Sequence, residues 1–264
     1  MSDAYHQLLD ATIDYLHGLK QQGVRYINFA PSTMLQSERG QLVRAEDESN
    51  TRGQAVRAPG QSKAGEIAAL REQAMACVKC AHLASSRKNV VFGVGSIDAE
   101  LMFVGEAPGA DEDTQGEPFV GAAGQLLTKI IQAMGLSRQT VYIANILKCR
   151  PDTPGQSSGN RKPTPGEMQT CIPYLEAQID LIKPKILVAL GGTAVEGLLG
   201  MSGIMKMRGN WQTYRGIPLM PTYHPSYLLR NQAPAEKRRV WEDMMQVMEK
   251  LGLPISEKQR AYFL

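Results

Sequence analysis

Four cysteines are the residues of this 264-residue chain whose type and spacing most clearly suggest chemistry. Cys77 and Cys80 form a Cys-x-x-Cys pair, whereas Cys149 and Cys171 occur singly later in the chain. Zinc ribbons usually supply two close pairs, so one pair with two dispersed cysteines suits an iron–sulfur cluster at least as well. Zinc binding and four unrelated buried thiols are the alternatives. The amino-terminal residues lack the continuous apolar block of an export signal, so we expect a metal site or reduced thiols before disulfides.

Small and polar residues follow four short apolar segments. The first segment is followed by GEAPG, which contains Glu106, and the second ends at Asn145. A Gly-Gly-Thr sequence follows the third, and His224-Pro225-Ser226 follows the fourth. Ligands of open parallel sheets bind beyond the carboxyl ends of the strands. We therefore expect a carboxylate, an amide and an imidazole to line one mouth of such a sheet, with ordinary loop composition as the alternative.

The segment 105–127 combines glycines, acidic residues and an aromatic residue. Its glycines allow tight turns and a close approach of the backbone to a ligand. Glu106 and Glu112 belong to a group of crowded carboxylates, which can raise one another's pKa or position a water molecule. Phe119 lies between this loop and a predicted helix, where it either faces a flat ligand or packs in the core.

Basic residues gather in the segments that would surround this mouth. They are Lys148, Arg150, Arg161, Lys162, Lys206, Arg208, Arg215, Arg230, Lys237, Arg238 and Arg239. A basic rim around an acidic, aromatic pocket suits a polyanion whose uncharged part enters the pocket. The formal net charge of the whole chain is only +3, so the affinity would depend on where these residues lie. Each of them taken alone is equally explained as a solvated surface charge.

The order of apolar segments predicts the elements that position these residues. Buried strands are predicted at Leu101–Val104, Val141–Ile146, Ile186–Leu190 and Pro218–Tyr223. Helices are predicted near Ala122–Met134, Gly166–Ile182, Thr193–Leu199 and Ala235–Leu251. This alternation favours an α/β fold with three layers, α/β/α, around a central, mainly parallel four-stranded sheet.

The residues before this sheet form a separate part of the predicted organisation. We expect an amphipathic helix at Tyr5–Gln22, a polar linker at Ser37–Ser62 and a second helix from near Lys63 into Cys77. The chain is thus divided into an N-terminal helical extension with its linker, residues 1–75, and a folded domain, residues 76–264. With 43% hydrophobic and 21% charged residues it can bury a sizeable core. No apolar segment approaches the roughly 18 residues that span a bilayer, which excludes a transmembrane protein.

Six motifs resemble those of the iron–sulfur uracil-DNA glycosylases, family 4 of the uracil-DNA glycosylase superfamily. They are GEAPG (105–109), EDTQGEPFVGAAGQLL (112–127), NILKCRP (145–151), NRKP (160–163), LGGTA (190–194) and TYHPSYLLR (222–230). With the Cys-x-x-Cys pair they cover residues 77–230 in the order of the family. The resemblance implies a glycosylase-like domain at 76–264 and a [4Fe–4S] cluster on the four cysteines, with a structural role.

The resemblance also implies roles for the residues of the expected pocket. Phe119 would stack on an extruded uracil, Asn145 would hydrogen-bond its Watson–Crick edge, and His224 would donate toward its carbonyl. Backbone N–H groups near Ala107 would hold the base. The residues assigned to the substrate are Gly105, Ala107, Phe119 and Asn145, and the catalytic candidates are Glu106, Glu112 and His224. The two glutamates would position water or stabilise the cationic sugar.

DNA contacts are expected from one further set of residues, namely Lys148, Arg150, Arg208, Ser226, Leu228 and Arg230. Leu228, four residues after His224, would enter the base stack that the flipped nucleotide leaves. The implied protein is a monomeric DNA-repair hydrolase of the prokaryotic cytoplasm, associated with the nucleoid, that releases uracil from DNA and leaves an abasic site. The alternative is a non-catalytic or altered-specificity nucleic-acid-binding member of the same fold.

Two features depart from the related families. The segment 151–160 is longer than usual in family 4, and it contains no histidine, so we expect no covalent trapping on DNA by the route of the branch that uses a histidine there. Ala107 stands where some other branches carry a water-activating aspartate. The sequence therefore leaves open the general base, the preference for single- or double-stranded DNA, and the acceptance of other deaminated bases.

Overall fold

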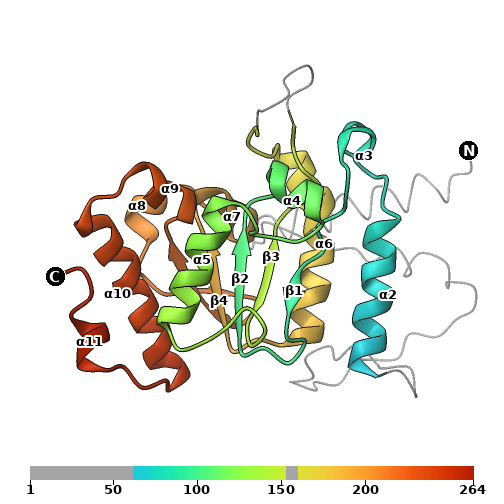
Figure 1. The fold of residues 1–264 in the computed structure, drawn as a ribbon. Helices are drawn as coiled ribbons and strands as arrows, with labels where there is room; N and C mark the ends of the chain where they lie inside the picture. The colour runs from blue at the N-terminus through green and yellow to red at the C-terminus, as the bar shows by residue number, and fades with distance from the viewer. Residues whose placement is uncertain (1–61, 153–159) are drawn as a thin grey trace, which may run out of the picture. The chain divides into compact units, whose positions relative to one another are not determined.

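The structure is a computed structural model that describes residues 62–152 and 160–264, and Figure 1 shows its ribbon. The predicted helix at Tyr5–Gln22 and the predicted linker, apart from Ser62, lie outside the described residues. In the part of the chain that is described, no helix has the length and the apolar character needed to cross a membrane.

A six-stranded mixed sheet lies at the centre of the fold, in the order β1-β3-β2-β4-β6-β5. Its four inner strands are parallel and are β3 (Tyr142–Asn145), β2 (Leu101–Gly105), β4 (Ile186–Leu190) and β6 (Ile217–Thr222). Every residue of β2 and β4 is buried, because helices cover both faces of the sheet. The predicted α/β fold with a mainly parallel centre is confirmed.

Two antiparallel edge strands, β1 (Val94–Gly95) and β5 (Gln212–Tyr214), were absent from the prediction. They have two and three residues, and none of these is buried, so no apolar segment marks them in the sequence. The β5 strand pairs with β6 across a short turn in which Arg215 and Gly216 both have positive φ, 50° and 80°.

Ten helices surround the sheet in the described residues. They are α2 (Lys63–Met75), α3 (Ala81–Ser86), α4 (Ala110–Gln115), α5 (Ala122–Ala133), α6 (Pro165–Ile182), α7 (Gly192–Leu199), α8 (Ile204–Met207), α9 (Pro225–Arg230), α10 (Pro234–Leu251) and α11 (Glu257–Arg260). The four long helices predicted within the domain agree with α5, α6, α7 and α10 to within a residue or two at each end. The start of α6 is fixed by a capping box in which Thr164 and Glu167 satisfy each other's backbone N–H groups.

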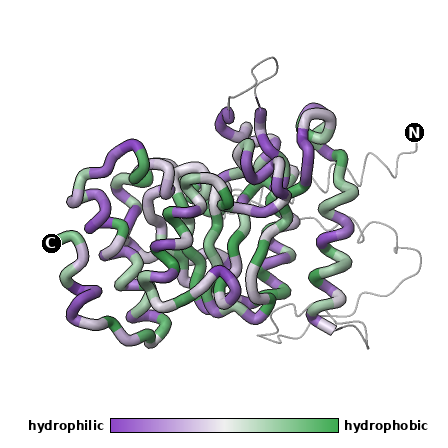
Figure 2. Tube along the Cα trace, viewed as in Figure 1, coloured by the Kyte–Doolittle hydropathy of each residue, from purple (hydrophilic) through white to green (hydrophobic). Residues whose placement is uncertain are grey.

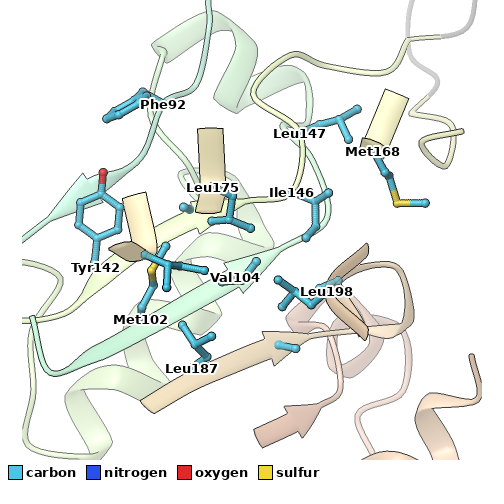
Figure 3. Packing of buried hydrophobic residues seen from close by; sticks show 14 of the residues in the cluster. Phe92, Met102, Val104, Tyr142, Ile146, Leu147, Met168, Leu175, Leu187 and Leu198 are labelled. Atoms are coloured by element: carbon cyan, nitrogen blue, oxygen red, sulfur yellow. The ribbon is translucent and has the colours of Figure 1, made fainter. Parts of the chain in front are cut away.

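The core consists of two clusters on opposite faces of the sheet. Alternate residues of β2 belong to different clusters, because successive side chains of a strand point to opposite faces. Met102 and Val104 pack with α6 and α7 (Figure 3), whereas Leu101 and Phe103 pack with α5 and α10. Figure 2 shows the hydrophobic residues concentrated along the strands between these helical layers. The three-layer arrangement is therefore a direct consequence of strands that are apolar on both faces.

Helix α2 packs on the same face as α6. Its partly buried side chains Ile67 and Leu70 contact the first cluster, and Lys63 forms an ion pair of 2.8 Å with Asp98. Lys63 also donates to the carbonyl oxygen of Ile182, at 3.2 Å, at the end of α6. The domain boundary that we place after residue 75 stays a prediction.

Candidate active site

A cleft of about 660 Å³ opens at the carboxyl ends of the parallel strands. Its walls come from the loops after β2, β3, β4 and β6, so four strand ends meet in one space. The predicted site residues that line it are Glu106, Ala107, Glu112, Phe119, Asn145, His224, Ser226 and Arg230. Gly105, the last residue of β2, lies against two of these side chains.

Phe119 forms an aromatic wall of the cleft. Its buried ring lies 5.6 Å from the imidazole of His224, centroid to centroid, with 31° between the ring planes. A Cβ atom on Gly105 would approach Cζ of this ring to 2.5 Å, so only glycine leaves room for the ring there. The backbone of Phe119 is left-handed, with φ of 56°, which is unusual for a bulky residue. The ring is thus held at the cleft by a disfavoured backbone conformation.

Asn145 presents a polar group that the protein leaves unsatisfied. The residue is 2% exposed and lines the cleft, and its Oδ1 has no hydrogen-bond partner among the described residues. A buried acceptor without a donor is energetically costly, so such atoms commonly mark a binding site. The amide can therefore pair with a ligand that offers a complementary edge of donors and acceptors.

His224 has a defined tautomer. Its Nδ1 accepts a hydrogen bond from the backbone N–H of Ser226, at 3.1 Å, and a backbone N–H can only donate. The proton of the neutral ring is therefore on Nε2. Burial, and then the charge of Arg230, lower the pKa of His224 to about 4, although the carboxylate of Glu112 acts in the opposite direction. At neutral pH the ring is an uncharged N–H donor.

The two glutamates of the cleft differ in their surroundings. Oε1 of Glu112 accepts hydrogen bonds from the backbone N–H groups of Val120, at 2.9 Å, and Gly121, at 3.0 Å. Its Oε2 accepts from the N–H of Gly109, at 3.1 Å, so Glu112 braces the loop between β2 and α5. The carboxylate of Glu106 lines the cleft and has no hydrogen-bond partner within residues 62–152 and 160–264. Glu106 is the glutamate whose oxygens are available to a ligand.

Arg138 was not predicted and supports Phe119 from outside the cleft. Its Nη2 donates to the carbonyl oxygen of Pro118, at 2.7 Å, and its Nη1 to that of Phe119, at 3.1 Å. Met205, which is 72% exposed and lines the cleft, was missed as well. Neither residue belongs to a recognisable motif, so the sequence alone carries no signal for them.

Lys148 lies in the interior rather than at the rim. It is 2% exposed, and its Nζ donates to the carbonyl oxygen of Asn145, at 3.0 Å, and to Oε1 of Gln178, at 2.6 Å. These contacts give the lysine a supporting position behind Asn145. They do not favour the DNA contact that we expect for it from the sequence.

Two more of the expected DNA contacts have internal partners. Arg208 binds the buried carboxylate of Asp243 and the carbonyl oxygen of Arg239, and it is 17% exposed. Leu228 is 4% exposed because it packs with Tyr223 and Val240. To enter the base stack of DNA, as we expect from the sequence, Leu228 would have to leave this cluster.

The remaining expected DNA contacts lie at the cleft or beside it. Ser226 and Arg230 line the cleft, with Arg230 exposed at its rim. Arg150 is partly exposed and donates from Nε to Oδ1 of Asn160, at 2.8 Å, and Asn160 also lines the cleft. These three residues can therefore reach a molecule bound over the mouth.

The four cysteines come from three segments of the chain and are all unpaired thiols. Burial raises the pKa of Cys80, and the neighbouring Cys149 and Cys77 raise it further. Burial also raises the pKa of Cys171 to about 11, with contributions in the same direction from Cys149 and Cys77. Cys77 and Cys149 therefore lie within electrostatic range of both Cys80 and Cys171.

The surroundings of the sulfurs fit a sulfur-ligated cluster. The backbone N–H of Lys148 donates to Sγ of Cys171, at 3.2 Å, and Nη1 of Arg87 donates to Sγ of Cys149, at 3.1 Å. Within the described residues, no group of three or more His, Cys, Asp or Glu side chains, these four thiols included, is arranged to hold a single metal ion, so the fit to a cluster rests on the donors beside the sulfurs. The ammonium of Lys148 meets two oxygens but no carboxylate in that part of the chain. Four thiols, two of which accept N–H donors, beside a buried cation suit an anionic cluster.

Comparisons with known proteins agree with this geometry. Residues 92–245 match the family described as the uracil DNA glycosylase superfamily. The chain is 45% identical to a type-4 uracil-DNA glycosylase of Thermotoga maritima over 179 residues, which are 66% of this chain and 88% of the relative. It is 41% identical to the type-4 enzyme of Sulfurisphaera tokodaii over 205 residues, or 74% of this chain and 89% of the relative.

A third relative gives the same result. The type-4 uracil-DNA glycosylase of Saccharolobus solfataricus is 41% identical over 193 residues, which are 69% of this chain and 85% of the relative. These matches confirm the resemblance that the six motifs indicate. The chain therefore belongs to the uracil-DNA glycosylase superfamily and, within it, to the type-4 uracil-DNA glycosylases.

Proposed function

We propose that this protein is a DNA-repair glycosylase that extrudes uracil from DNA and hydrolyses its N-glycosidic bond, leaving an abasic site. The observation that carries the proposal is the unsatisfied Oδ1 of buried Asn145 in the same cleft as the Nε2–H of His224 and the ring of Phe119. Together they offer an acceptor, a donor and a stacking surface to one flat base. Family membership supports the same activity.

Selection of uracil follows from the amide of Asn145. Uracil presents an N3–H donor beside an O4 acceptor, which matches the acceptor and donor of one amide. Cytosine presents an unprotonated N3 beside an amino group, so the same amide would face it with mismatched groups. A site that leaves buried polar atoms unpaired rejects the wrong substrate strongly.

Bond cleavage leaves negative charge on the departing base and positive charge on the sugar. The neutral His224 would donate its Nε2–H toward O2 of uracil as this charge grows. Since Ser226 fixes the other ring nitrogen, the donor is preorganised, and such donors contribute about 10²–10³ in rate in comparable oxyanion sites. Glu106 would stabilise the cationic sugar or position the attacking water. Glu112 would act through the loop that it braces.

DNA would lie across the mouth of the cleft. We infer phosphate contacts for Arg150, Ser226 and Arg230, whose side chains line or adjoin it. Lys148, Arg208 and Leu228 would support the site from inside the fold. The base must leave the helix before it reaches Asn145, at a cost of a few kcal/mol. We infer a monomer that acts on chromosomal DNA in the cytoplasm.

The four cysteines Cys77, Cys80, Cys149 and Cys171 would hold a [4Fe–4S] cluster with a structural role. A [4Fe–4S]²⁺ core with four thiolates has a net charge of −2, which would offset the buried charge of Lys148. The cluster would join the segment after α2, the loop after β3 and helix α6. Zinc is the competing metal. Equal amounts of iron and acid-labile sulfide in the purified protein would support the cluster, and zinc without iron would exclude it.

The decisive experiment is excision of uracil from a 5′-labelled oligonucleotide, followed by alkali cleavage at the abasic site. The wild type should give strand breaks at uracil, and His224→Ala should be about 10²–10³-fold slower because the donor is lost. Gln132→Ala, which changes an exposed amide on α5, is the control and should match the wild type. DNA binding without any abasic product, even at enzyme excess, would instead favour the non-catalytic alternative.

A further inference from the structure

The backbone at Phe119 needs external support. A left-handed φ of 56° is disfavoured for a bulky aromatic residue, and it persists only where neighbouring groups stabilise it. Phe119 also lies in a loop between α4 and α5, where no strand pairing or helical hydrogen bonding fixes it. The groups that contact the adjacent peptide units therefore determine where the ring points.

Two charged side chains hold these peptide units from opposite sides. The carbonyl oxygens of Pro118 and Phe119 accept hydrogen bonds from Arg138, at 2.7 and 3.1 Å. The next two N–H groups, those of Val120 and Gly121, donate to one oxygen of Glu112, at 2.9 and 3.0 Å. Three consecutive peptide units are thus bound through four polar groups to one guanidinium and one carboxylate.

The start of α5 completes the support. A Cβ atom on Gly124 would overlap the carbonyl group of Phe119, so helix α5 approaches the strained residue as closely as a glycine allows. Arg138 lies in the loop after the same helix and also approaches Oγ1 of Thr128, at 3.5 Å. The Phe119 backbone thus contacts the start of α5 at Gly124 and is bound to the loop after α5 through Arg138.

We propose that Arg138 is a positioning residue, which together with Glu112 clamps Phe119 so that its ring is ready to stack on the extruded base. This rests on the proposed function, because it assigns that ring to base binding. Arg138 does not line the cleft, so it acts through Phe119 and not on the base itself. Its role is to set the affinity for the base.

The kinetic test compares Arg138→Met and Arg138→Lys with the wild type. Arg138→Met should raise KM for uracil-containing DNA, and the inhibition constant of free uracil, by roughly tenfold, as expected for the loss of charge-assisted hydrogen bonds. The change in kcat should be smaller, since stacking stabilises the bound base before and during bond cleavage. Arg138→Lys retains the charge and one donor and should recover part of the affinity.

A double mutant separates positioning from a general loss of structure. In a Phe119→Ala background, Arg138→Met should have almost no further effect on the inhibition constant of uracil. Equal effects in both backgrounds, or an unchanged KM and inhibition constant in Arg138→Met, would overturn the inference. Arg260→Met is the control, because it also removes one arginine, on α11, whose side chain forms an ion pair of 3.8 Å with Glu249 and does not line the cleft. It should leave both constants unchanged.

A crystal structure of Arg138→Met gives an outcome that does not depend on activity. The clamp predicts that Phe119 leaves its left-handed conformation or becomes disordered once Arg138 is removed. An unchanged φ and ring position would refute it, even if the wild type proved inactive on uracil. An inactive wild type would refute the proposed function alone. Should Arg138→Met not fold, the structure and kinetics of Arg138→Lys decide the question in the same way.

Discussion

The base cleft and the cysteine site both adjoin the end of β3, but they treat polar atoms in opposite ways. In the cleft, Oδ1 of Asn145 and the carboxylate of Glu106 have no partners among the described residues. At the cysteine site, the sulfurs of Cys149 and Cys171 already accept N–H donors from the protein. A site that must bind and release a substrate keeps hydrogen-bonding capacity free, whereas a site for a permanent group is already supplied with donors.

Lys148 connects the two sites. Its backbone N–H donates to Sγ of Cys171, and its side chain donates to the carbonyl oxygen of Asn145. Asn145, which we propose pairs with the base, and Cys149, which would hold the cluster, are thus only four positions apart at the end of β3. Variants on either side should nevertheless separate substrate turnover from stability.

The largest effect should come from the unsatisfied amide. Asn145→Ala removes the acceptor and donor for the uracil edge and should lower kcat/KM for uracil excision by about 10³-fold. Iron content and the unfolding temperature should remain close to those of the wild type, because the change leaves the sulfur ligands intact. Steady-state kinetics together with iron analysis checks both statements. A parallel loss of iron would contradict the separation of the two sites.

A change at the cysteine site should lower the iron content and the stability while leaving uracil excision intact. Cys149→Ser should lower the iron content and reduce the unfolding temperature by on the order of 10 °C, because metal binding contributes directly to folding free energy. Protein that remains folded at low temperature should still excise uracil. Val78→Ala, a change between two of the cysteines at a side chain that is 70% exposed, is the control. Full stability of Cys149→Ser would argue against the structural role.

The titration of His224 tests the electrostatics of the cleft. With its pKa lowered from 6.5 to about 4, the ring is neutral in the folded state while the unfolded chain takes up a proton as the pH falls below 6.5. The contribution of the neutral ring to stability is therefore complete above pH 6.5 and is lost as the pH falls toward 4. Arg230 and Glu112 are the charged groups that act on the ring, in opposite directions.

Two measurements check this titration. The NMR signal of His224 should titrate near pH 4, and the unfolding free energy of His224→Gln should fall less between pH 7 and pH 5 than that of the wild type. A titration near 6.5 would show that the ring is exposed to solvent and that the donor is lost in mildly acidic solution.

The smallest effect should come from the left-handed backbone of Phe119, the aromatic residue that lines the cleft. Phe119→Gly and Phe119→Ala both lose the ring, but glycine adopts a left-handed φ without the steric penalty that alanine retains. Phe119→Gly should therefore be more stable than Phe119→Ala by about 1 kcal/mol, as measured by chemical denaturation. Equal stabilities would mean that the backbone relaxes once the ring is removed.

The sequence predicted the parts of this molecule that depend on local pattern. Apolar runs located the four parallel strands, and the rule that ligands bind at strand ends identified Asn145 and His224. The edge strands were missed because they are too short to carry a pattern. Arg138 was missed because it binds backbone carbonyl groups, which every residue possesses.

Burial of charged side chains was beyond the reach of the sequence. Arg208 is internal because Asp243, far away in the chain, offers it a buried carboxylate, which also accepts from Thr222 at 2.6 Å. Lys148 is internal because Gln178 and the carbonyl oxygen of Asn145 receive its amino group. A basic residue near a predicted mouth looks the same in the sequence whether it faces solvent or such a partner.

The short edge strands have a consequence for the behaviour of the protein at high concentration. Without β1 and β5, the sheet of four parallel strands would end at β3 and β6. The free edges of these two strands would then present rows of unpaired N–H and C=O groups. Strands of two and three residues, running antiparallel to their neighbours, cover these edges and present only a short template of their own. Edge-to-edge pairing between copies, a common route to aggregation of open sheets, is thereby disfavoured at both sides of the sheet.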